Sequence, residues 1–251
     1  MSAIGVIPAR FASQRFPGKV LTPIDGVPML RRVWEGARGA KRLRDVLVAT
    51  DDERVQRACA VFGARALLTR PEHPSGTDRV AEVALGLDDE VVVNIQGDEP
   101  LIEGFVIDAA VEALESDLLA AMATVAHVAG PDALDDPNRV KLVLDRRGYA
   151  LYFSRSPIPA RRPGAPAARV LQHVGIYAYR RRFLLEYVDL PQTPAERSEG
   201  LEQLRALEHG HRVRCAVIEG WSSTPVDVPG DLDAVIEGLR ARRRAAPVPA
   251  C

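Results

Sequence analysis

The chain has 251 residues, of which 47% are hydrophobic, 27% charged and 5% aromatic; this composition indicates a globular protein and excludes a disordered or fibrous chain. The 33 basic and 34 acidic residues nearly cancel, so no overall field favours nucleic acid or an anionic membrane as a partner. The sequence has no apolar run long enough to cross a membrane, no signal-peptide pattern, and no cysteine spacing typical of a disulfide framework or a zinc site. We therefore expect a cytoplasmic protein.

Strands and helices alternate in the first half of the chain. Short β-branched runs predict strands that are buried on both faces, at 4–7, 46–50 and 91–95. Helical patterns separate and follow them, at 29–38, 53–62, 78–87 and 103–114, the third with Thr77 as its N-cap. This alternation predicts an open, mostly parallel α/β sheet flanked by helices.

The second half is less regular. A hairpin is predicted over 140–144 and 149–154, and further strands over 174–179 and 213–218. Thr193 and Glu196 match a capping box with proline at the first helical position, which predicts a helix to about residue 208. A closing helix is expected over 231–244, and the proline-rich segment 157–168 indicates a flap or surface connection. No long linker interrupts the chain, so we expect one domain.

The loop that follows the first strand, residues 8–19, concentrates positive charge. It contains Arg10, Arg15 and Lys19, small residues and a Pro-Gly turn, at the strand end where ligands bind in α/β sheets. Lys19 is one of only three lysines against 30 arginines, and the two cations are not interchangeable at a phosphate. This loop is not a Walker A motif, because Val20 follows Lys19. We interpret it as a polyphosphate site, the alternative being a solvated turn.

Two carboxylates and a small turn complete the candidate chemistry. Asp98 follows the strand at 91–95, and Asp227 precedes the closing helix; Mg²⁺ prefers one or two carboxylates together with substrate phosphates. The turn at 73–78 offers free amides and hydroxyls to a ligand. For all three, ordinary helix capping is the alternative interpretation, and for Asp98 a solvated strand end is another.

These segments together resemble one family. The sequence is similar to the 3-deoxy-D-manno-octulosonate (KDO) cytidylyltransferases, within the sugar nucleotidyltransferases. The resemblance covers residues 3 to 240 and rests on motifs at 7–19, 49–51, 75–79, 94–100, 136–141, 149–155, 173–177, 201–205 and 226–227. Those at 152–155, 173–177 and 202–205 are the ones that point to KDO enzymes. This family implies a Rossmann-like sheet with a hairpin-containing subregion for sugar binding and dimerisation.

The resemblance also implies a reaction and roles for individual residues. CMP would pass from CTP to the anomeric hydroxyl of KDO, releasing pyrophosphate, for lipopolysaccharide synthesis by a Mg²⁺-dependent homodimer. Residues 1–130 would form the CTP half, 131–240 the sugar half and 241–251 a flexible tail. The nucleotide-binding residues would be Ala9, Arg10, Ser13, Arg15, Lys19, Ser75, Gly76 and Gln96. The metal ligands would be Asp98 and Asp227, which with Arg10 and Lys19 make the catalytic set. The sugar-binding residues would be Arg155, His173, Glu202 and Gln203.

Several alternatives stay open. His173 could be a core histidine, and the neighbouring Glu202 and Gln203 would project about 100° apart on a helix. Departures from the family pattern on the sugar side leave room for an 8-amino relative of KDO or a sialic-acid type substrate, at Gln172, Gly200, 222–225 and Gly230. A non-catalytic nucleotide-binding module is a further alternative. A dehydrogenase is disfavoured, because the first strand-to-helix turn lacks G-x-G-x-x-G.

Overall fold

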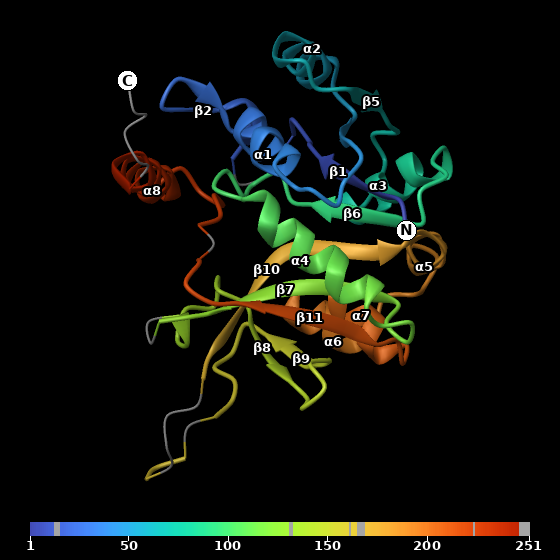
Figure 1. Ribbon diagram of the computed structural model, residues 1–251, viewed down its shortest axis with the longest axis vertical. Coiled ribbons are helices and arrows are strands. Elements are labelled where there is room, and N and C mark those ends of the chain that lie inside the picture. Colours follow the sequence, from blue (N-terminus) through green and yellow to red (C-terminus); the bar gives the residue numbers. More distant parts are fainter. Residues whose placement is uncertain (13–15, 131–132, 161, 165–168, 223, 246–251) are drawn as a thin grey trace.

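A computed structural model describes residues 1–12, 16–130, 133–160, 162–164, 169–222 and 224–245 (Figure 1). The first half alternates strands and helices as predicted: β1 (Ala3–Pro8), η1 (Lys19–Leu21), β2 (Pro23–Ile24), β3 (Val27–Pro28), α1 (Met29–Arg38), β4 (Val46–Thr50), α2 (Glu53–Phe62), β5 (Ala66–Leu68), α3 (Gly76–Leu85), β6 (Val91–Ile95) and α4 (Gly104–Glu115). The second half contains β7 (Met122–Val128), β8 (Lys141–Leu144), β9 (Ala150–Ser154), β10 (Leu171–Arg180), α5 (Arg181–Tyr187), α6 (Pro194–Glu199), α7 (Gln203–Glu208), β11 (Val213–Ile218) and α8 (Asp231–Ala245).

One nine-stranded sheet joins both halves of the chain. Its main path runs β11-β7-β10-β6-β1-β4-β5, and the hairpin β8–β9 is attached to the start of β10. The pairs β1–β4, β1–β6, β4–β5 and β7–β11 are parallel, whereas β10 lies antiparallel between β6 and β7. The predicted α/β fold, with a central sheet flanked by helices and a β-hairpin subregion, is therefore confirmed. The sheet is mixed rather than mostly parallel, because β10 pairs antiparallel with β6, β7 and β8, and β8 pairs antiparallel with β9.

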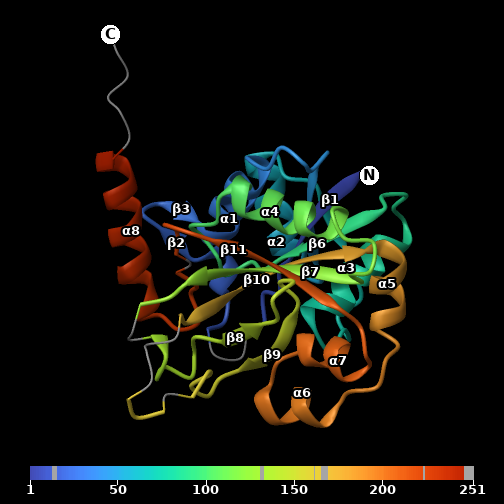
Figure 2. The same cartoon turned by 60° about the horizontal axis from the view of Figure 1, so that its bottom comes forward.

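Helices cover both faces of this sheet, as Figures 1 and 2 show. Apolar side chains of α1, α2 and α4 form one core with the sheet, and those of α3, α5 and α7 form the core on the other face. The strands β4 and β6 are buried at every position, because a helical layer covers each face. Continuous apolar runs therefore predicted these two strands correctly.

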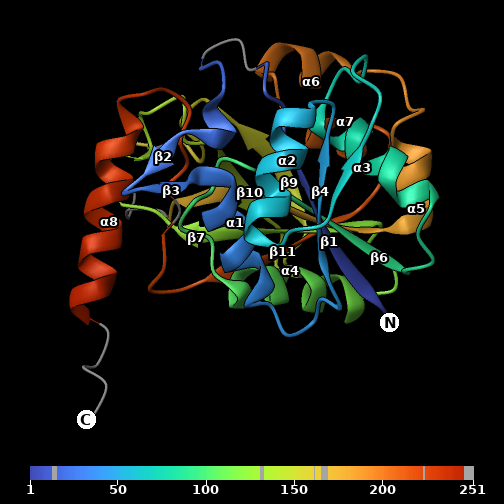
Figure 3. The same ribbon diagram turned by 90° about the horizontal axis from the view of Figure 1, so that it is seen from above.

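The last helix packs away from the sheet. α8 lies at one end of the molecule beside β2 and β3 (Figure 3), where Val235 and Val226 join a third apolar cluster with Ile24 and Met29. The helix includes the first five residues of the expected tail, and residues 246–251 lie outside the described part. No helix in the described ranges combines the length and apolar character that crossing a membrane requires.

Some predicted elements were wrong in detail. The N-cap of α3 is Ser75 rather than Thr77, because the Ser75 hydroxyl accepts hydrogen bonds from the next amides. The single helix expected up to residue 208 is two helices, since Gly200 ends α6 in the left-handed region at φ 63°. The strand β7 was missed because its buried Thr124 and His127 interrupt the apolar run. Also missed were β2, β3, β5 and α5.

Candidate active site

The expected nucleotide and sugar residues meet at one edge of the sheet. β1 ends at Pro8 and β6 at Ile95, and these parallel strands end on the same side. Because β10 is antiparallel to β6 and pairs Ile176 with Ile95, its first half also reaches this edge. The antiparallel insertion therefore brings the 173–177 segment beside the end of β6, which comes about 80 residues earlier in the chain.

The two aspartates expected to bind metal lie on either side of Lys19. The Lys19 ammonium donates to Asp98 Oδ2 at 3.0 Å and lies 3.9 Å from Asp227 Oδ1. It also donates to the Val226 carbonyl at 2.7 Å, and the Val226 amide donates to the Asp98 carbonyl at 2.9 Å. Asp98 and Asp227, which are 129 positions apart in sequence, thus lie in one charged cluster with Lys19.

A pocket of about 570 Å³ opens beside this cluster. Its lining includes the expected nucleotide residues Arg10, Lys19, Ser75, Gly76 and Gln96 together with Asp98. Arg10 is held in place by a hydrogen bond from Nη2 to the His73 carbonyl at 2.7 Å, while Ala9 is buried and does not line the pocket. Ser13 and Arg15 lie outside the described residues. The structure therefore gathers most of the predicted nucleotide residues around one cavity.

The Ser75–Gly76 turn has a structural role within this wall. The Ser75 hydroxyl accepts from the Thr77 and Asp78 amides and donates to Asp78 Oδ2 at 2.6 Å, so the capping interpretation of this turn is confirmed. A Cβ on Gly76 would lie 3.2 Å from Pro8 Cγ, which is why a residue without a side chain fits there. What the turn offers a ligand is therefore mainly backbone at the start of α3.

A second pocket, of about 440 Å³, adjoins the first. All four residues expected to bind sugar contribute to it: Arg155, His173, Glu202 and Gln203. Gly76, Gln96 and Asp98 line both pockets. Two ligands that occupied these cavities would therefore meet beside Asp98.

His173 lies between aromatic rings in the sugar-side pocket. Its ring contacts Phe153 edge-on at 5.2 Å and Tyr177 at 5.3 Å, and Nε2 is 3.0 Å from Thr124 Oγ1. Burial lowers the pKa of His173 to about 3, so the ring is neutral at physiological pH. It both packs in the core and lines the cavity, which combines the two interpretations of this residue.

This neutral histidine predicts a pH effect on stability. An unfolded histidine gains its proton near pH 6.5, whereas folded His173 resists protonation down to about pH 3. The contribution of neutral His173 to the free energy of unfolding is therefore fully present above about pH 6.5. It is lost as the pH decreases toward 3, by at most about 1.4 kcal/mol per pH unit. We expect His173→Gln to flatten this slope in denaturant unfolding measured from pH 7 to 4. His209→Gln, at an exposed histidine, is the control, and identical slopes in wild type and His173→Gln would contradict the prediction.

Glu202 and Gln203 both reach the sugar-side pocket despite being adjacent in sequence. Glu202 is the N-cap of α7 and Gln203 its first residue, and both line the pocket, so the expected 100° separation does not keep either residue out. Glu202 Oε2 accepts from Thr77 Oγ1 at 2.8 Å, and burial raises the pKa of its carboxyl group. Gln203 is buried, and its Nε2 has no hydrogen-bond partner among the described residues. A buried amide without a partner at a cavity wall is suited to a ligand oxygen.

Lys141 supports the wall of the sugar-side pocket from within the protein core. Its side chain is completely buried, and Nζ donates to the carbonyls of Asp136 at 2.8 Å and Arg155 at 2.6 Å. Desolvation lowers its pKa. Lys141 is another of the three lysines and ends the 136–141 motif, so its scarcity was the signal in the sequence that could have pointed to it.

Arg155 and Glu199 extend this support. The Arg155 guanidinium donates to the Glu199 carbonyl at 2.8 Å and the Pro137 carbonyl at 3.1 Å. The Glu199 carboxylate accepts from the Arg155 amide at 2.9 Å and from Ser154 Oγ at 2.6 Å. Sequence reasoning missed Glu199 entirely. Arg155 is therefore bound to two backbone segments as well as lining the pocket.

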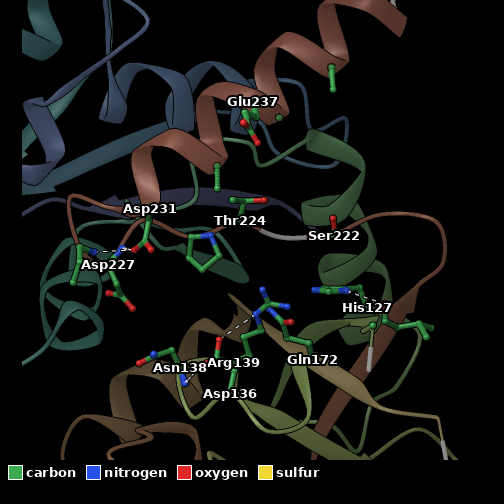
Figure 4. Close-up of a pocket in the computed structure, with 17 residues that line it drawn as sticks. His127, Asp136, Asn138, Arg139, Gln172, Ser222, Thr224, Asp227, Asp231 and Glu237 are labelled. Atoms are coloured by element: carbon green, nitrogen blue, oxygen red, sulfur yellow. Dashed lines mark hydrogen bonds and ion pairs between the residues drawn. The ribbon is translucent and has the colours of Figure 1, made fainter. Parts of the chain in front are cut away.

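A third cavity, of about 720 Å³, lies between α8, the end of β7 and the 136–139 loop (Figure 4). It shares Asn138, Gln172, Pro225 and Asp227 with the sugar-side pocket. At its edge, Asp231 Oδ2 accepts from the amides of Asp227 at 2.7 Å and Val228 at 2.9 Å. The first carboxylate of α8 thus fixes the turn that carries Asp227.

The described residues contain no group of three or more histidine, cysteine, aspartate or glutamate side chains that could hold a metal. The donor set at Lys19 is smaller: two carboxylates and one carbonyl lie around its ammonium. Two carboxylates completed by substrate phosphates are the pattern typical of Mg²⁺. The residues present therefore fit a divalent ion that arrives with a phosphate ligand.

The fold and the adjoining pockets at the strand ends define a nucleotidyltransferase, and comparison with known proteins specifies which kind. The cytidylyltransferase family model matches residues 4–213, so the chain belongs to this family. A 3-deoxy-manno-octulosonate cytidylyltransferase of Solibacter usitatus is 52% identical over 241 residues, covering 95% of this chain and 94% of the relative. One from Geotalea daltonii is 46% identical, covering 96% and 100%.

Solved structures agree with this assignment. A structure of CMP:2-keto-3-deoxy-manno-octonic acid synthetase complexed with CTP matches with a TM-score of 0.90 and 42% identity, covering 97% of this chain and all of the other. A cytidylyltransferase from Leptospira borgpetersenii, at TM-score 0.59 and 14% identity, shares the fold. The family resemblance read from the sequence motifs is confirmed.

Proposed function

We propose that this protein transfers CMP from CTP to KDO, giving CMP-KDO and pyrophosphate for lipopolysaccharide synthesis. The observation that carries the proposal is the pair of pockets that share Gly76, Gln96 and Asp98. Such an arrangement suits a reaction in which two bound molecules exchange a group at their junction. The high identity to KDO cytidylyltransferases over nearly the whole chain supports KDO over sialic-acid type substrates.

The reaction is a displacement at phosphorus. The anomeric oxygen of KDO forms a bond to the α-phosphorus of CTP, the bond from that phosphorus to the bridging oxygen breaks, and pyrophosphate leaves with those electrons. The proton of the hydroxyl group passes to solvent. Nucleotidyl transfer of this kind depends on positioning and charge neutralisation more than on a covalent intermediate. No nucleophilic serine or cysteine is required.

On the nucleotide side, the proposed roles follow the charges of the pocket. Arg10 and Lys19 would hold the triphosphate, together with Ser13, Arg15 and the backbone at Ala9. Ser75, Gly76 and Gln96 would contact the cytosine. Gly76 supports this assignment because it lines both pockets and a Cβ there would lie only 3.2 Å from Pro8 Cγ, so glycine keeps this part of the wall open to the base.

Asp98 and Asp227 are the proposed ligands of Mg²⁺. When bound, the ion would neutralise charge on the phosphates and favour departure of pyrophosphate. The role of this chain is to hold the two carboxylates together: the bond between the Val226 amide and the Asp98 carbonyl joins the two segments, and Asp231 fixes the Asp227 turn.

On the sugar side, we propose that Arg155, His173, Glu202 and Gln203 receive KDO. The unpartnered Nε2 of Gln203 supports a contact with a sugar hydroxyl. Neutral His173 can accept or donate one hydrogen bond without adding charge. Arg155 would provide the positive charge that a keto-acid carboxylate requires.

We further propose a cytoplasmic homodimer with no nucleic-acid or membrane partner. Within the described strands, β9 pairs with β8 and otherwise forms an edge. This edge exposes Leu151 and Tyr152, a combination that natural proteins commonly cover. The exposed hairpin supports its proposed part in dimerisation, and sedimentation equilibrium would test the oligomeric state.

The function is tested by pyrophosphate release with CTP and Mg²⁺ across KDO, 8-amino-KDO and sialic acid, with UTP and ATP as control nucleotides. We expect release with CTP and KDO. Release only with another keto acid would change the assigned substrate. No release with any acid, despite CTP binding, would favour a non-catalytic nucleotide-binding module.

A conservative substitution tests the role of Lys19. We expect Lys19→Arg to lower kcat about tenfold or more although the charge is kept, because a planar guanidinium cannot replace a compact ammonium between two carboxylates. Steady-state kinetics with both substrates would measure this. Lys41→Arg, at an exposed lysine, is the control. Wild-type kcat in Lys19→Arg would contradict the argument.

A further inference from the structure

The Lys19 ammonium occupies the centre of the oxygen set proposed to bind the metal. Three oxygens surround it: the Val226 carbonyl at 2.7 Å, Asp98 Oδ2 at 3.0 Å and Asp227 Oδ1 at 3.9 Å. The Lys19 side chain is only 12% exposed. An ammonium has three N–H donors and no acceptor, so it can bond only to acceptors such as these oxygens.

A divalent ion at the two aspartates would compete for these same oxygens. Two cations cannot both lie in contact with Asp98 Oδ2 and Asp227 Oδ1 without strong mutual repulsion. Binding of the ion therefore requires Lys19 to give up at least part of its contacts. That exchange lowers the affinity for the metal unless Lys19 finds another anionic partner.

The triphosphate of CTP would be that partner. Lys19 lines the nucleotide-side pocket as well as touching the aspartates, and a flexible four-carbon stem lets its ammonium turn from one to the other. We propose that Lys19 is an internal substitute for the metal ion in the nucleotide-free enzyme. It holds the two carboxylates together and keeps free divalent ions out until a triphosphate draws it away.

This inference rests on the proposed function, because it takes the aspartates as the metal ligands. The proposed role of Lys19 adds an order of binding, nucleotide with metal, which does not follow from naming the two aspartates as metal ligands. Nucleotide and metal become coupled through one side chain, so each raises the affinity for the other by the same factor. The metal is then recruited together with CTP rather than before it.

The first test measures Mn²⁺ binding by electron paramagnetic resonance without nucleotide. We expect Lys19→Met to bind Mn²⁺ about tenfold more tightly than wild type, because the competing ammonium is gone. Arg10→Met removes one positive charge from the same pocket, where the guanidinium donates to the His73 carbonyl, and should change the affinity less than about threefold. Equal effects of the two variants, or no tightening in Lys19→Met, would overturn the inference. Circular dichroism would verify that both variants fold.

The second test uses the wild-type protein. The chain has only three lysines, so ¹³C-lysine labelling gives three side-chain signals that Lys41→Arg and Lys19→Met assign. We expect the Lys19 signal to stay unchanged with Mg²⁺ alone and to shift when CTP and Mg²⁺ are added together. A shift with Mg²⁺ alone, or no shift with both, would contradict the proposed exchange.

These results are independent of the function assay. Pyrophosphate release by wild type, combined with no tightening in Lys19→Met, would remove the inference and leave the proposed reaction intact. Failure of wild type to bind Mn²⁺ even with CTP, combined with no pyrophosphate release, would instead remove the proposed function and the inference with it.

Discussion

Asp98→Asn should reduce kcat by about 10³-fold or more, about 4 kcal/mol of transition-state stabilisation, while the protein still folds. Asp98 lines both pockets and contacts Lys19 at 3.0 Å. The amide has nearly the same shape as the carboxylate but no charge, so it can neither hold a divalent ion well nor attract the ammonium. The substitution therefore removes charge at the junction of the two substrates and little else.

The measurement is steady-state pyrophosphate release, with unfolding in denaturant as the check on the fold. Asp88→Asn is the matched control, because Asp88 is exposed near the opposite end of β6. We expect Asp88→Asn to be indistinguishable from wild type in both measurements. Turnover within about tenfold of wild type in Asp98→Asn would mean that its charge has no central part in the reaction.

Lys141→Met is expected to weaken KDO binding while leaving CTP binding nearly unchanged. The buried ammonium bonds the carbonyls of Asp136 and Arg155, which belong to two segments that flank the sugar-side pocket. Methionine fills a similar volume but leaves both carbonyls short of a donor, at a cost of about 1–3 kcal/mol each. We expect KM for KDO to rise about tenfold or more, and the free energy of unfolding to fall.

The split between the two substrates makes this prediction specific. A merely global loss of stability would not raise KM for KDO while leaving KM for CTP within about twofold. Lys41→Met is the control, because Lys41 is exposed and lines neither pocket. Equal changes in the two KM values, or none, would show that Lys141 does not position the sugar-side wall.

The structure also explains which parts of the site could be anticipated. Arg10, Gln96 and Asp98 closely follow strong strand patterns, and Lys19 lies in the charged segment after the first of them; the ends of parallel strands lie at one edge of a sheet. Their proximity therefore follows from local sequence and a general rule. No such rule predicts the position of Asp227. Its place beside Asp98 depends on the hydrogen bond from the Val226 amide to the Asp98 carbonyl and on the packing of α8.

Other features depended on contacts that no local pattern records. β10 was expected as a strand, but its antiparallel place between β6 and β7 is what brings His173 to the site. Lys141 donates to the Arg155 carbonyl and Glu199 accepts from the Arg155 amide, and these backbone partners in other segments are not visible in sequence. The N-cap of α3 was wrongly assigned by two residues, because Ser75 and Thr77 are both good capping residues and only the backbone geometry distinguishes them.

The sequence by itself determined the alternation of strands and helices, the cytidylyltransferase family and the charged segments at the strand ends, because these depend on periodicity, composition and motifs within short stretches of chain. Only the tertiary structure decided that Lys19 lies between Asp98 and Asp227, and that two pockets share one wall. Those facts depend on which distant segments pack together. That packing is set by the burial of apolar surface over the whole domain, which no single segment specifies.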